Sequence, residues 1–374
     1  MTKPRVLTVV GTRPEIIRLS RVIAHLDDAT DHVLVHTGQN YDRQLNEVFF
    51  EELGIRSPDH YLGVDTSSLG ATMGDVLRKS ETCFNEVKPD AVLVLGDTNS
   101  AISVVMAKRM HIPSYHMEAG NRSFDENVPE ETNRRLVDHV ADFNLPYTEH
   151  ARRNLLAEGL SPRRIAVTGS PMREVIDHYR DAIDGSDVLA RLEVEPNGYF
   201  LVSAHRQENV DSPERLGALL DSLRAVHERW GLPILVSTHP RTRVRLKALQ
   251  AEEIPGVRFH EPFGFLDYCK LQINARCVLS DSGTISEESA MLGFDAITIR
   301  DSMERPEALE AGIVVMTGLR APEIVAGIEE ATSRRYGTAR VAPADYQIAD
   351  TSRRVVSFIL STVGRHHEWA GVRR

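Results

Sequence analysis

The chain has 374 residues, 41% hydrophobic and 26% charged, an ordinary globular composition whose length suits two domains. Its formal net charge of −10 argues against nucleic-acid binding, which needs a basic surface. Cys83, Cys269 and Cys277 form no CxxC pair, so neither a disulfide framework nor a zinc ribbon is predicted, and we expect a cytoplasmic protein. No stretch approaches the roughly 18 apolar residues of a membrane helix, so we expect no membrane contact.

Short β-branched runs alternate with helical patterns along the chain. In the first half the predicted strands are 6–10, 32–37, 91–97, 112–116 and 164–169. The first of them is too short for a signal peptide. Amphipathic patterns predict helices between these strands, among them 14–26 and 70–87. The second half repeats the rhythm with predicted strands at 199–205, 233–239, 277–283 and 295–300, and with predicted helices at 212–230 and 307–312.

This alternation predicts an α/β fold in which helices cover both faces of parallel sheets, and its recurrence predicts two doubly wound domains. The expected join lies between Pro171 and Pro196, a polar helical stretch that ends in turn residues. A last helical pattern, 351–363, can pack on either half. Ligands of open parallel sheets bind beyond the carboxyl ends of the strands, so candidate functional residues are those that directly follow each strand.

The segment GTRPE, residues 11–15, follows the first predicted strand. Thr12 and Glu15 have the spacing of a helix capping box, and Pro14 suits a first helical turn. Capping alone does not explain Arg13, because a cation is unfavourable at the positive end of a helix dipole. An anion bound by Arg13 and by the helix N-terminus would explain it. Both interpretations stay open. The segment matches neither GxGxxG nor a Walker A loop.

The segment DSGTISEE, residues 281–288, follows a strand of the second half. Thr284 and Glu287 again have capping-box spacing, so a capped turn would explain most of the segment. Alternatively, the hydroxyls and amides of the Ser-Gly-Thr turn would hold a phosphate, where the glycine permits close backbone approach. Glu288 is not needed by the cap and could hold ribose hydroxyls.

Acids and histidines follow other predicted strands. Asp97 is the last residue of the predicted strand 91–97. It could be the N-cap of the next helix or a functional carboxylate. His205 and His239 end two strands of the second half, and a histidine in such a place is often structural. Two of them at neighbouring strand ends favour one shared site.

Residues 116–134, HMEAGNRSFDENVPEETNR, contain five carboxylates, two arginines and a histidine. Glu130 and Arg134 are spaced i, i+4 on a helix that Pro129 starts, so a surface ion pair would explain these two. It does not explain Glu118, which lies two residues past a strand. A solvated loop and a site that needs several acids both remain open.

Together these segments resemble the non-hydrolysing UDP-N-acetylglucosamine 2-epimerase family. The motifs that match occur in the family's order: GTRPE, GDT, HMEAGNR…PEETNR, SAHRQEN, DSGTISEE and RDSMERPEA. The resemblance implies two Rossmann-like domains that face each other across a cleft, as in GT-B glycosyltransferases. The expected domains are residues 1–170 plus 351–374, which carry the sugar-site acids, and residues 171–350, which bind UDP. It also implies a homodimer, a UDP-sugar substrate, and neither a cofactor nor a metal.

The implied reaction interconverts UDP-GlcNAc and UDP-ManNAc. UDP leaves C1 while a base removes the C2 proton, and UDP then adds back to the 2-acetamidoglucal as C2 is protonated on the opposite face. Two faces need two proton-handling groups, and the departing diphosphate needs cations. No hydride moves, so no nicotinamide is required.

Carried over by motif, Asp97, Glu118, Glu130 and His205 are the implied catalytic residues. The implied substrate-binding residues are Arg13, Arg18, Arg134, His239, Ser282, Gly283, Thr284, Glu288 and Arg305. Arg18 stands where the family usually has lysine, which keeps the charge but changes its geometry.

Some motifs depart from the common UDP-GlcNAc enzymes. EAGNR, GDTNS, HRQEN and SGTISEE stand in place of EAGLR, GDTTT, HRREN and SGGIQEE. These variants resemble a branch that acts on modified UDP-HexNAc sugars, either 6-deoxy-talose/fucose types or 2,3-diacetamido-glucuronate. A GT-B glycosyltransferase, which would need an acceptor site, is a further alternative, and a nucleotide-sugar sensor without turnover is another.

Overall fold

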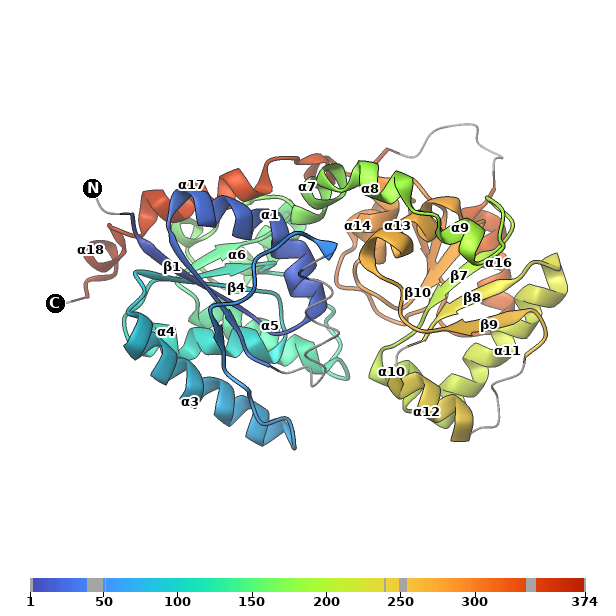
Figure 1. Ribbon diagram of the computed structural model, residues 1–374, viewed down its shortest axis with the longest axis horizontal. Helices are drawn as coiled ribbons and strands as arrows, with labels where there is room; N and C mark the ends of the chain where they lie inside the picture. Colours follow the sequence, from blue (N-terminus) through green and yellow to red (C-terminus); the bar gives the residue numbers. More distant parts are fainter. Residues whose placement is uncertain are drawn as a thin grey trace. The chain divides into compact units, whose positions relative to one another are not determined.

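The computed structural model describes residues 3–38, 50, 52–238, 240–248, 254–333 and 341–372. The chain divides into two compact units (Figure 1). Unit 1 is Met1–Asp177 with Gln347–Arg374, and unit 2 is His178–Tyr346. The boundaries expected from the sequence are 170/171 and 350/351.

Unit 1 is built on a parallel sheet of six strands in the order β3-β2-β1-β4-β5-β6. The strands are β1 (Arg5–Val10), β2 (Asp31–His36), β3 (His60–Tyr61), β4 (Ala91–Leu95), β5 (Ser114–Met117) and β6 (Phe143–Leu145). The chain moves outward from β1 to β3 and then returns to β4 on the other side of β1. The carboxyl ends of β1 and β4 therefore flank the switch point, where doubly wound sheets bind their ligands.

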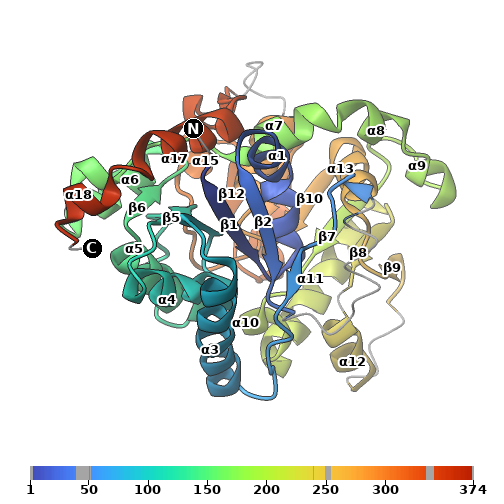
Figure 2. The ribbon, with the colours of Figure 1, turned by 60° about the vertical axis from the view of Figure 1, so that its left-hand side comes forward.

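Helices cover both faces of this sheet. They are α1 (Arg13–Ala29), α3 (Leu69–Val87), α4 (Val104–Arg109), α5 (Pro129–Val140), α6 (Glu149–Ala157), α7 (Pro171–His178), α17 (Thr351–Thr362) and α18 (His366–Ala370), with the 3-10 turns η1 (Asn99–Ser103) and η2 (Pro162–Arg164). The 3-10 turn η3 (Ala344–Gln347) lies where the chain passes from unit 2 back to unit 1. Alternate residues of β1, Leu7 and Val9, join a buried cluster with α3 and α4. The C-terminal α17 lies beside α1 (Figure 2), and the Tyr115 hydroxyl lies 2.8 Å from Thr362 Oγ1 of α17.

Unit 2 repeats the architecture with the strand order β12-β11-β10-β7-β8-β9, again all parallel. The strands are β7 (Phe200–Ser203), β8 (Ile234–Ser237), β9 (Val257–His260), β10 (Cys277–Ser280), β11 (Ala296–Thr298) and β12 (Val314–Met316). The helices are α8 (Arg180–Gly185), α9 (Val188–Arg191), α10 (Gln207–Val210), α11 (Pro213–Trp230), α12 (Pro240–Ala248), α13 (Phe265–Asn274), α14 (Ile285–Leu292), α15 (Glu307–Glu310) and α16 (Ala321–Ala331). Phe200 and Val202 join one buried cluster and Leu201 the other, so both faces of β7 are covered.

The predicted α/β class with two doubly wound domains is confirmed. The predicted strand 164–169 is wrong, because the segment has a single bridge, from Ile165 to Asn144, although Ala166 and Thr168 also donate backbone hydrogen bonds to the carbonyls of Asn144 and Pro146. The turn η2 occupies Pro162–Arg164, and Gly169 has a φ of +84°, which extended strands do not adopt. The short strands β3, β6, β9 and β12 were not predicted.

Candidate active site

Glu15 ties together the turns that follow β1 and β4. The predicted capping box of α1 is present, and the Glu15 carboxylate accepts hydrogen bonds from the amides of Gly11 at 2.8 Å and Thr12 at 2.7 Å. It also accepts hydrogen bonds from the hydroxyls of Thr98 and Ser100. Burial is the largest influence on this carboxyl and raises its pKa, although the hydrogen bonds act in the opposite direction. Glu15 thus does more than cap a helix.

Two of the predicted acids form ion pairs in unit 1. Glu118, directly after β5, accepts a hydrogen bond from Arg18 of α1, and both side chains are buried. Asp97, two residues after β4, accepts one from Arg134 of α5. Both acids thus follow neighbouring strand ends, because Leu95 of β4 pairs with Met117 of β5.

The backbone of Glu118 is strained. Its φ is +64°, the left-handed region that costs a residue with a side chain roughly 1–2 kcal/mol. Its amide donates to the Leu145 carbonyl at 3.2 Å, and its carboxylate lies beside Gly96, where an added Cβ would be 3.7 Å from Oε2. Such strain persists only where surrounding contacts impose it, and it is common at functional sites.

Arg134 pairs with Glu131 rather than with Glu130. The spacing of Glu130 and Arg134 allowed an ion pair, but Glu130, half-buried at the start of α5, makes no hydrogen bond or ion pair with any described residue. Glu131 Oε2 instead lies 2.7 Å from Arg134 Nη1 and accepts the Ser123 amide at 3.0 Å. Burial acts to raise the pKa of Glu131, but these contacts outweigh it and leave the pKa below its ordinary value. The sequence analysis missed Glu131 because it assigned Arg134 to Glu130, four residues earlier, whereas Glu131 lies three residues earlier.

A buried polar network supports the loop that carries Glu118. His116 Nε2 lies 2.8 Å from the Gly96 carbonyl oxygen, and His116 Nδ1 lies 2.9 Å from Asp138 Oδ1. Asp138 also accepts the Gly120 amide at 3.1 Å and pairs with Arg122 at 2.7 Å. This segment is therefore not a solvated loop, since His116, Arg122 and Asp138 are all at most 2% exposed. Buried polar networks of this kind fix one conformation when their members are satisfied.

Arg122 extends this network to the surface through Glu158, and this pair gives a pH prediction. Its hydrogen bonds with Glu158, at 2.7 and 2.6 Å, are the main reason that the Glu158 pKa is lowered to about 2. Because the folded-state pKa is the lower one, the stability from this carboxylate is complete above its ordinary pKa of 4.5 and is lost as pH falls towards 2.

We therefore expect Glu158→Gln to have a lower urea midpoint than the wild type near neutral pH, and we expect the two midpoints to converge as pH falls from about 4.5 to about 3. Glu81→Gln, an exposed position on α3, is the matched control and should follow the wild type throughout. A constant gap between Glu158→Gln and the wild type at every pH would contradict the assignment.

In unit 2, Asp281 positions His205. Asp281 is fully buried at the end of β10 and accepts the amides of His205 and Arg206, each at 3.0 Å, and Asn209 Nδ2, also at 3.0 Å. One of its oxygens lies 3.2 Å from His205 Nδ1, and the His205 side chain is 47% exposed. A carboxylate on Nδ1 orients the ring and leaves Nε2 for a ligand. Sequence reasoning missed this role of Asp281, although the residue opens the DSGTISEE motif.

Two amides of the turn that begins this motif form local hydrogen bonds: Ser282 N–H donates to Ser280 Oγ at 3.0 Å, and Thr284 N–H donates to Ser282 Oγ at 3.3 Å. The capping box predicted from Thr284 and Glu287 is wrong, because the Thr284 side chain does not cap α14 and its hydroxyl lies 2.9 Å from Ser282 Oγ instead. Glu287 is fully buried, with Oε1 3.8 Å from Arg305 Nε. A Cβ added at Gly283 would lie 2.3 Å from Glu304 Oε1 and 2.7 Å from Arg305 Nη1, so the ends of both side chains lie against the turn.

The predicted site residues thus fall into two groups. In unit 1 the contacts bring Arg18 to Glu118 and Arg134 to Asp97, while Arg13 begins α1 and Glu130 stands apart. In unit 2, His205 follows β7, and the turn of Ser282, Gly283 and Thr284 follows β10, which pairs directly with β7. Glu288 is half-buried and accepts a hydrogen bond from Gln272 Nε2 at 2.6 Å. His239 lies outside the described residues.

Comparison with known proteins decides the family. The model of the UDP-N-acetylglucosamine 2-epimerase family matches residues 24–360. The chain belongs to this family. Its members named 2-epimerases are isomerases, and the resemblance drawn from the motifs is confirmed.

The chain is similar to two solved epimerase structures along nearly its whole length. UDP-N-acetylglucosamine 2-epimerase from Rickettsia bellii is 43% identical with a TM-score of 0.91, over 98% of each chain. The enzyme from Methanocaldococcus jannaschii, in complex with UDP-GlcNAc and UDP, is 33% identical with a TM-score of 0.89, over 96% of this chain and 99% of that one.

A curated relative has a different substrate in its name. UDP-2,3-diacetamido-2,3-dideoxy-D-glucuronate 2-epimerase from Pseudomonas aeruginosa is 34% identical over 328 residues, which are 86% of this chain and 90% of the relative. The chain is therefore similar both to epimerases of UDP-GlcNAc and to an epimerase of a modified sugar. Among the described residues, no helix is both long and apolar enough to cross a membrane.

Proposed function

We propose that this epimerase interconverts UDP-GlcNAc and UDP-ManNAc by eliminating UDP and adding it back. The observation that carries the proposal is the pairing of Glu118 with Arg18 and of Asp97 with Arg134 at neighbouring strand ends of unit 1. The similar protein solved with UDP-GlcNAc and UDP supports the same substrate.

In the proposed mechanism the acids of unit 1 handle the C2 proton. Asp97, Glu118 and Glu130 supply the base on one face and the acid on the other, so the roles need at least two of them. Arg18 and Arg134 each orient one carboxylate and balance its charge next to a sugar that gains positive character as UDP leaves. Glu130 has no partner among the described residues, which leaves its carboxylate available to a ligand.

The proposed UDP site lies at the strand ends of unit 2. The turn 282–284, with Arg305 beside it, holds the diphosphate. Arg13 is assigned to phosphate binding by its motif alone. His205, oriented by Asp281, assists the departure of UDP. Glu288 binds the ribose. His239, predicted to bind substrate, belongs to this proposal by its motif alone.

A modified UDP-HexNAc is the second candidate substrate. It is favoured by the Pseudomonas aeruginosa relative and by the variant motifs EAGNR and SGTISEE. A glycosyltransferase is less well supported, because the family model describes an epimerase.

The test is incubation of the enzyme in D2O with a panel of UDP-HexNAc sugars, followed by NMR. We expect deuterium at C2 and inversion of C2 with UDP-GlcNAc, without any added acceptor or cofactor. Faster exchange with a 6-deoxy or a diacetamido-uronate sugar would move the assignment to that substrate. If no sugar of the panel exchanges its C2 proton, the proposed function is wrong.

Further proposals concern the setting of the enzyme. We expect a homodimer that works in the cytoplasm and supplies sugars for cell-surface polysaccharide. The three cysteines are free and buried, which supports a reducing compartment. Sedimentation equilibrium would test the dimer, and fractionation of cells would test the location.

A further inference from the structure

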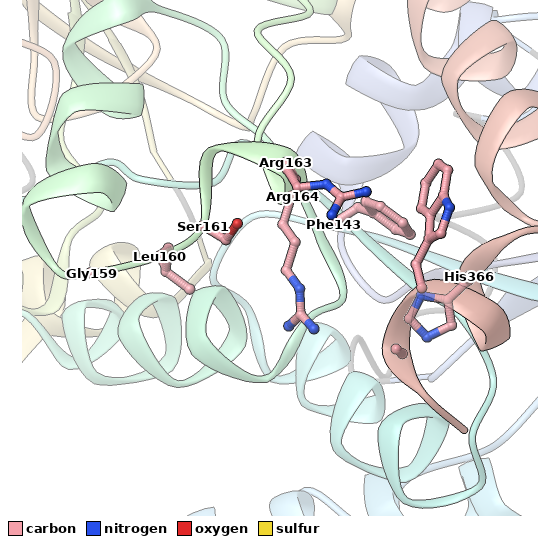
Figure 3. A pocket seen from close by; sticks show the side chains of 9 residues that line it. Phe143, Gly159, Leu160, Ser161, Arg163, Arg164 and His366 are labelled. Atoms are coloured by element: carbon pink, nitrogen blue, oxygen red, sulfur yellow. The ribbon is translucent and has the colours of Figure 1, made fainter. Parts of the chain in front are cut away.

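Unit 1 has a concave site at the amino end of its edge strand β6, whereas the acids follow the carboxyl ends of β4 and β5. A cavity of about 430 Å³ is lined by the first residue of β6, by the turn η2 and by α18 (Figure 3). The lining residues used below are Phe143, Ser161, Arg163, Arg164, His366 and Trp369. Phe143 lies at the amino end of β6, whereas Asp97 and Glu118 follow carboxyl ends, and the neighbouring strand β5 is roughly 10 Å long. This cavity is therefore separate from the proposed sugar site.

The walls of the cavity are aromatic and basic. Figure 3 shows the side chains of Arg163, Arg164, Phe143 and His366 around the same space. The rings of Phe143 and His366 lie 5.6 Å apart, and the Arg163 guanidinium lies 5.8 Å from the centroid of the Trp369 ring. The hydroxyl of Ser161 stands on the same wall as the arginines. Ring faces and guanidinium planes both stack on flat ligands.

The two arginines have no carboxylate partner. In the part of the chain that the structure describes, neither Arg163 nor Arg164 forms an ion pair or a side-chain hydrogen bond. Asp142, the acid near His366, is already held by Lys108 and by the amide and hydroxyl of Ser114, each at 3.1 Å. Arg163 is exposed and Arg164 is half-buried, and the two cations, without a carboxylate partner at the same cavity in a protein of net charge −10, favour an anion as its ligand.

We propose that this cavity binds a nucleoside phosphate, with the base between Trp369 and Phe143 and the phosphate on Arg163, Arg164 and Ser161. The volume lies within the range of small-molecule sites, roughly 300–1,000 Å³. Arginine forks match phosphate oxygens two at a time. A bound ligand would hold α18 against β6 and so stabilise the C-terminal end of unit 1. The inference does not depend on which sugar the enzyme epimerises.

Trp369 provides the measurement. The chain has two tryptophans, so Trp230→Phe leaves Trp369, at the cavity, as the only one. We expect UMP to quench its fluorescence in a saturable way. In the double variant Arg163→Gln/Arg164→Gln, built in the same background, UMP should bind at least about tenfold more weakly, because two charge-assisted contacts are lost. Arg153→Gln, an exposed arginine of α6 outside the cavity, is the matched control and should titrate like its parent.

The same titration with uridine and with inorganic phosphate separates the two halves of the ligand. We expect each to bind more weakly than UMP. Inorganic phosphate that binds as tightly as UMP would overturn the nucleoside part of the proposal. No saturable change with UMP, or an equal affinity in the double variant, would overturn the site as a whole. Calorimetry checks the result without the tryptophan substitution. The wild-type chain should show one more UMP binding event than the variant Arg163→Gln/Arg164→Gln.

Discussion

Replacing Glu118 with glutamine is expected to slow deuterium exchange at C2 of UDP-GlcNAc by about 10³-fold, within the range for a lost general acid or base. Glutamine keeps the shape of the side chain and can still accept the hydrogen bond from Arg18, but it cannot carry the C2 proton. UDP affinity should stay within about twofold of the wild type, because the residues proposed to hold the diphosphate belong mainly to unit 2. Exchange is followed by NMR and UDP binding by calorimetry.

Two further variants make this result interpretable. Glu126→Gln changes an exposed carboxylate of the same segment and should leave both quantities unchanged. Asp97→Asn should behave like Glu118→Gln, since Asp97 occupies the equivalent place after β4 with Arg134 as its partner. If Glu118→Gln weakened UDP binding as much as it slowed exchange, the glutamate would have a structural role instead.

Gly120→Ala is expected to destabilise unit 1 by about 4 kcal/mol, the sum of left-handed strain and of overpacking against backbone. Gly120 has a φ of +81°, and an added Cβ would lie 2.3 Å from the Ala151 carbonyl oxygen and 2.8 Å from Leu155 Cγ. Neither neighbour can move easily, because Ala151 and Leu155 are buried residues of α6. Urea unfolding measures the loss, and C2 exchange should fall with it, because Glu118 lies two residues away.

Gly159→Ala separates the two causes. Gly159 has a φ of +86°, but nothing lies within 4 Å of an added Cβ. Strain alone should therefore cost about 1–2 kcal/mol at this position. Equal losses of stability in the two variants would show that the contact between Gly120 and α6 is unimportant.

The fold could be predicted from the sequence because its strongest strands are buried on both faces. The runs that became β1, β4, β7 and β10 are mostly apolar and nearly all buried, and segments with helical periodicity separate them. The strands that were missed have two to four residues, too few to establish a period. The false strand at 164–169 is rich in apolar and β-branched residues, but it forms only one bridge and two backbone hydrogen bonds to the region of β6, too few for a strand.

That the candidate residues lie at strand ends could be predicted, but their pairings could not. Motifs after strands located Asp97, Glu118, His205 and the turn 282–284. Glu118 pairs with Arg18, which lies 100 residues earlier in the chain. Asp281 accepts a hydrogen bond from the amide of His205, which lies 76 residues earlier. Sequence spacing indicates contacts within one helix, but contacts across a sheet depend on strand order. For the same reason local spacing suggested a cap at Thr284 that the structure does not form.

The return of α17 to unit 1 affects how the protein is made. Unit 2 is one continuous segment, so it can fold as soon as that segment has left the ribosome. Unit 1 can be completed only after unit 2 and α17 have been synthesised, because Val355, Val356 and Ile359 of α17 are buried in unit 1. Until α17 emerges, the N-terminal part of unit 1 exposes the apolar surface that α17 will cover, and chaperones that act during translation can bind that surface.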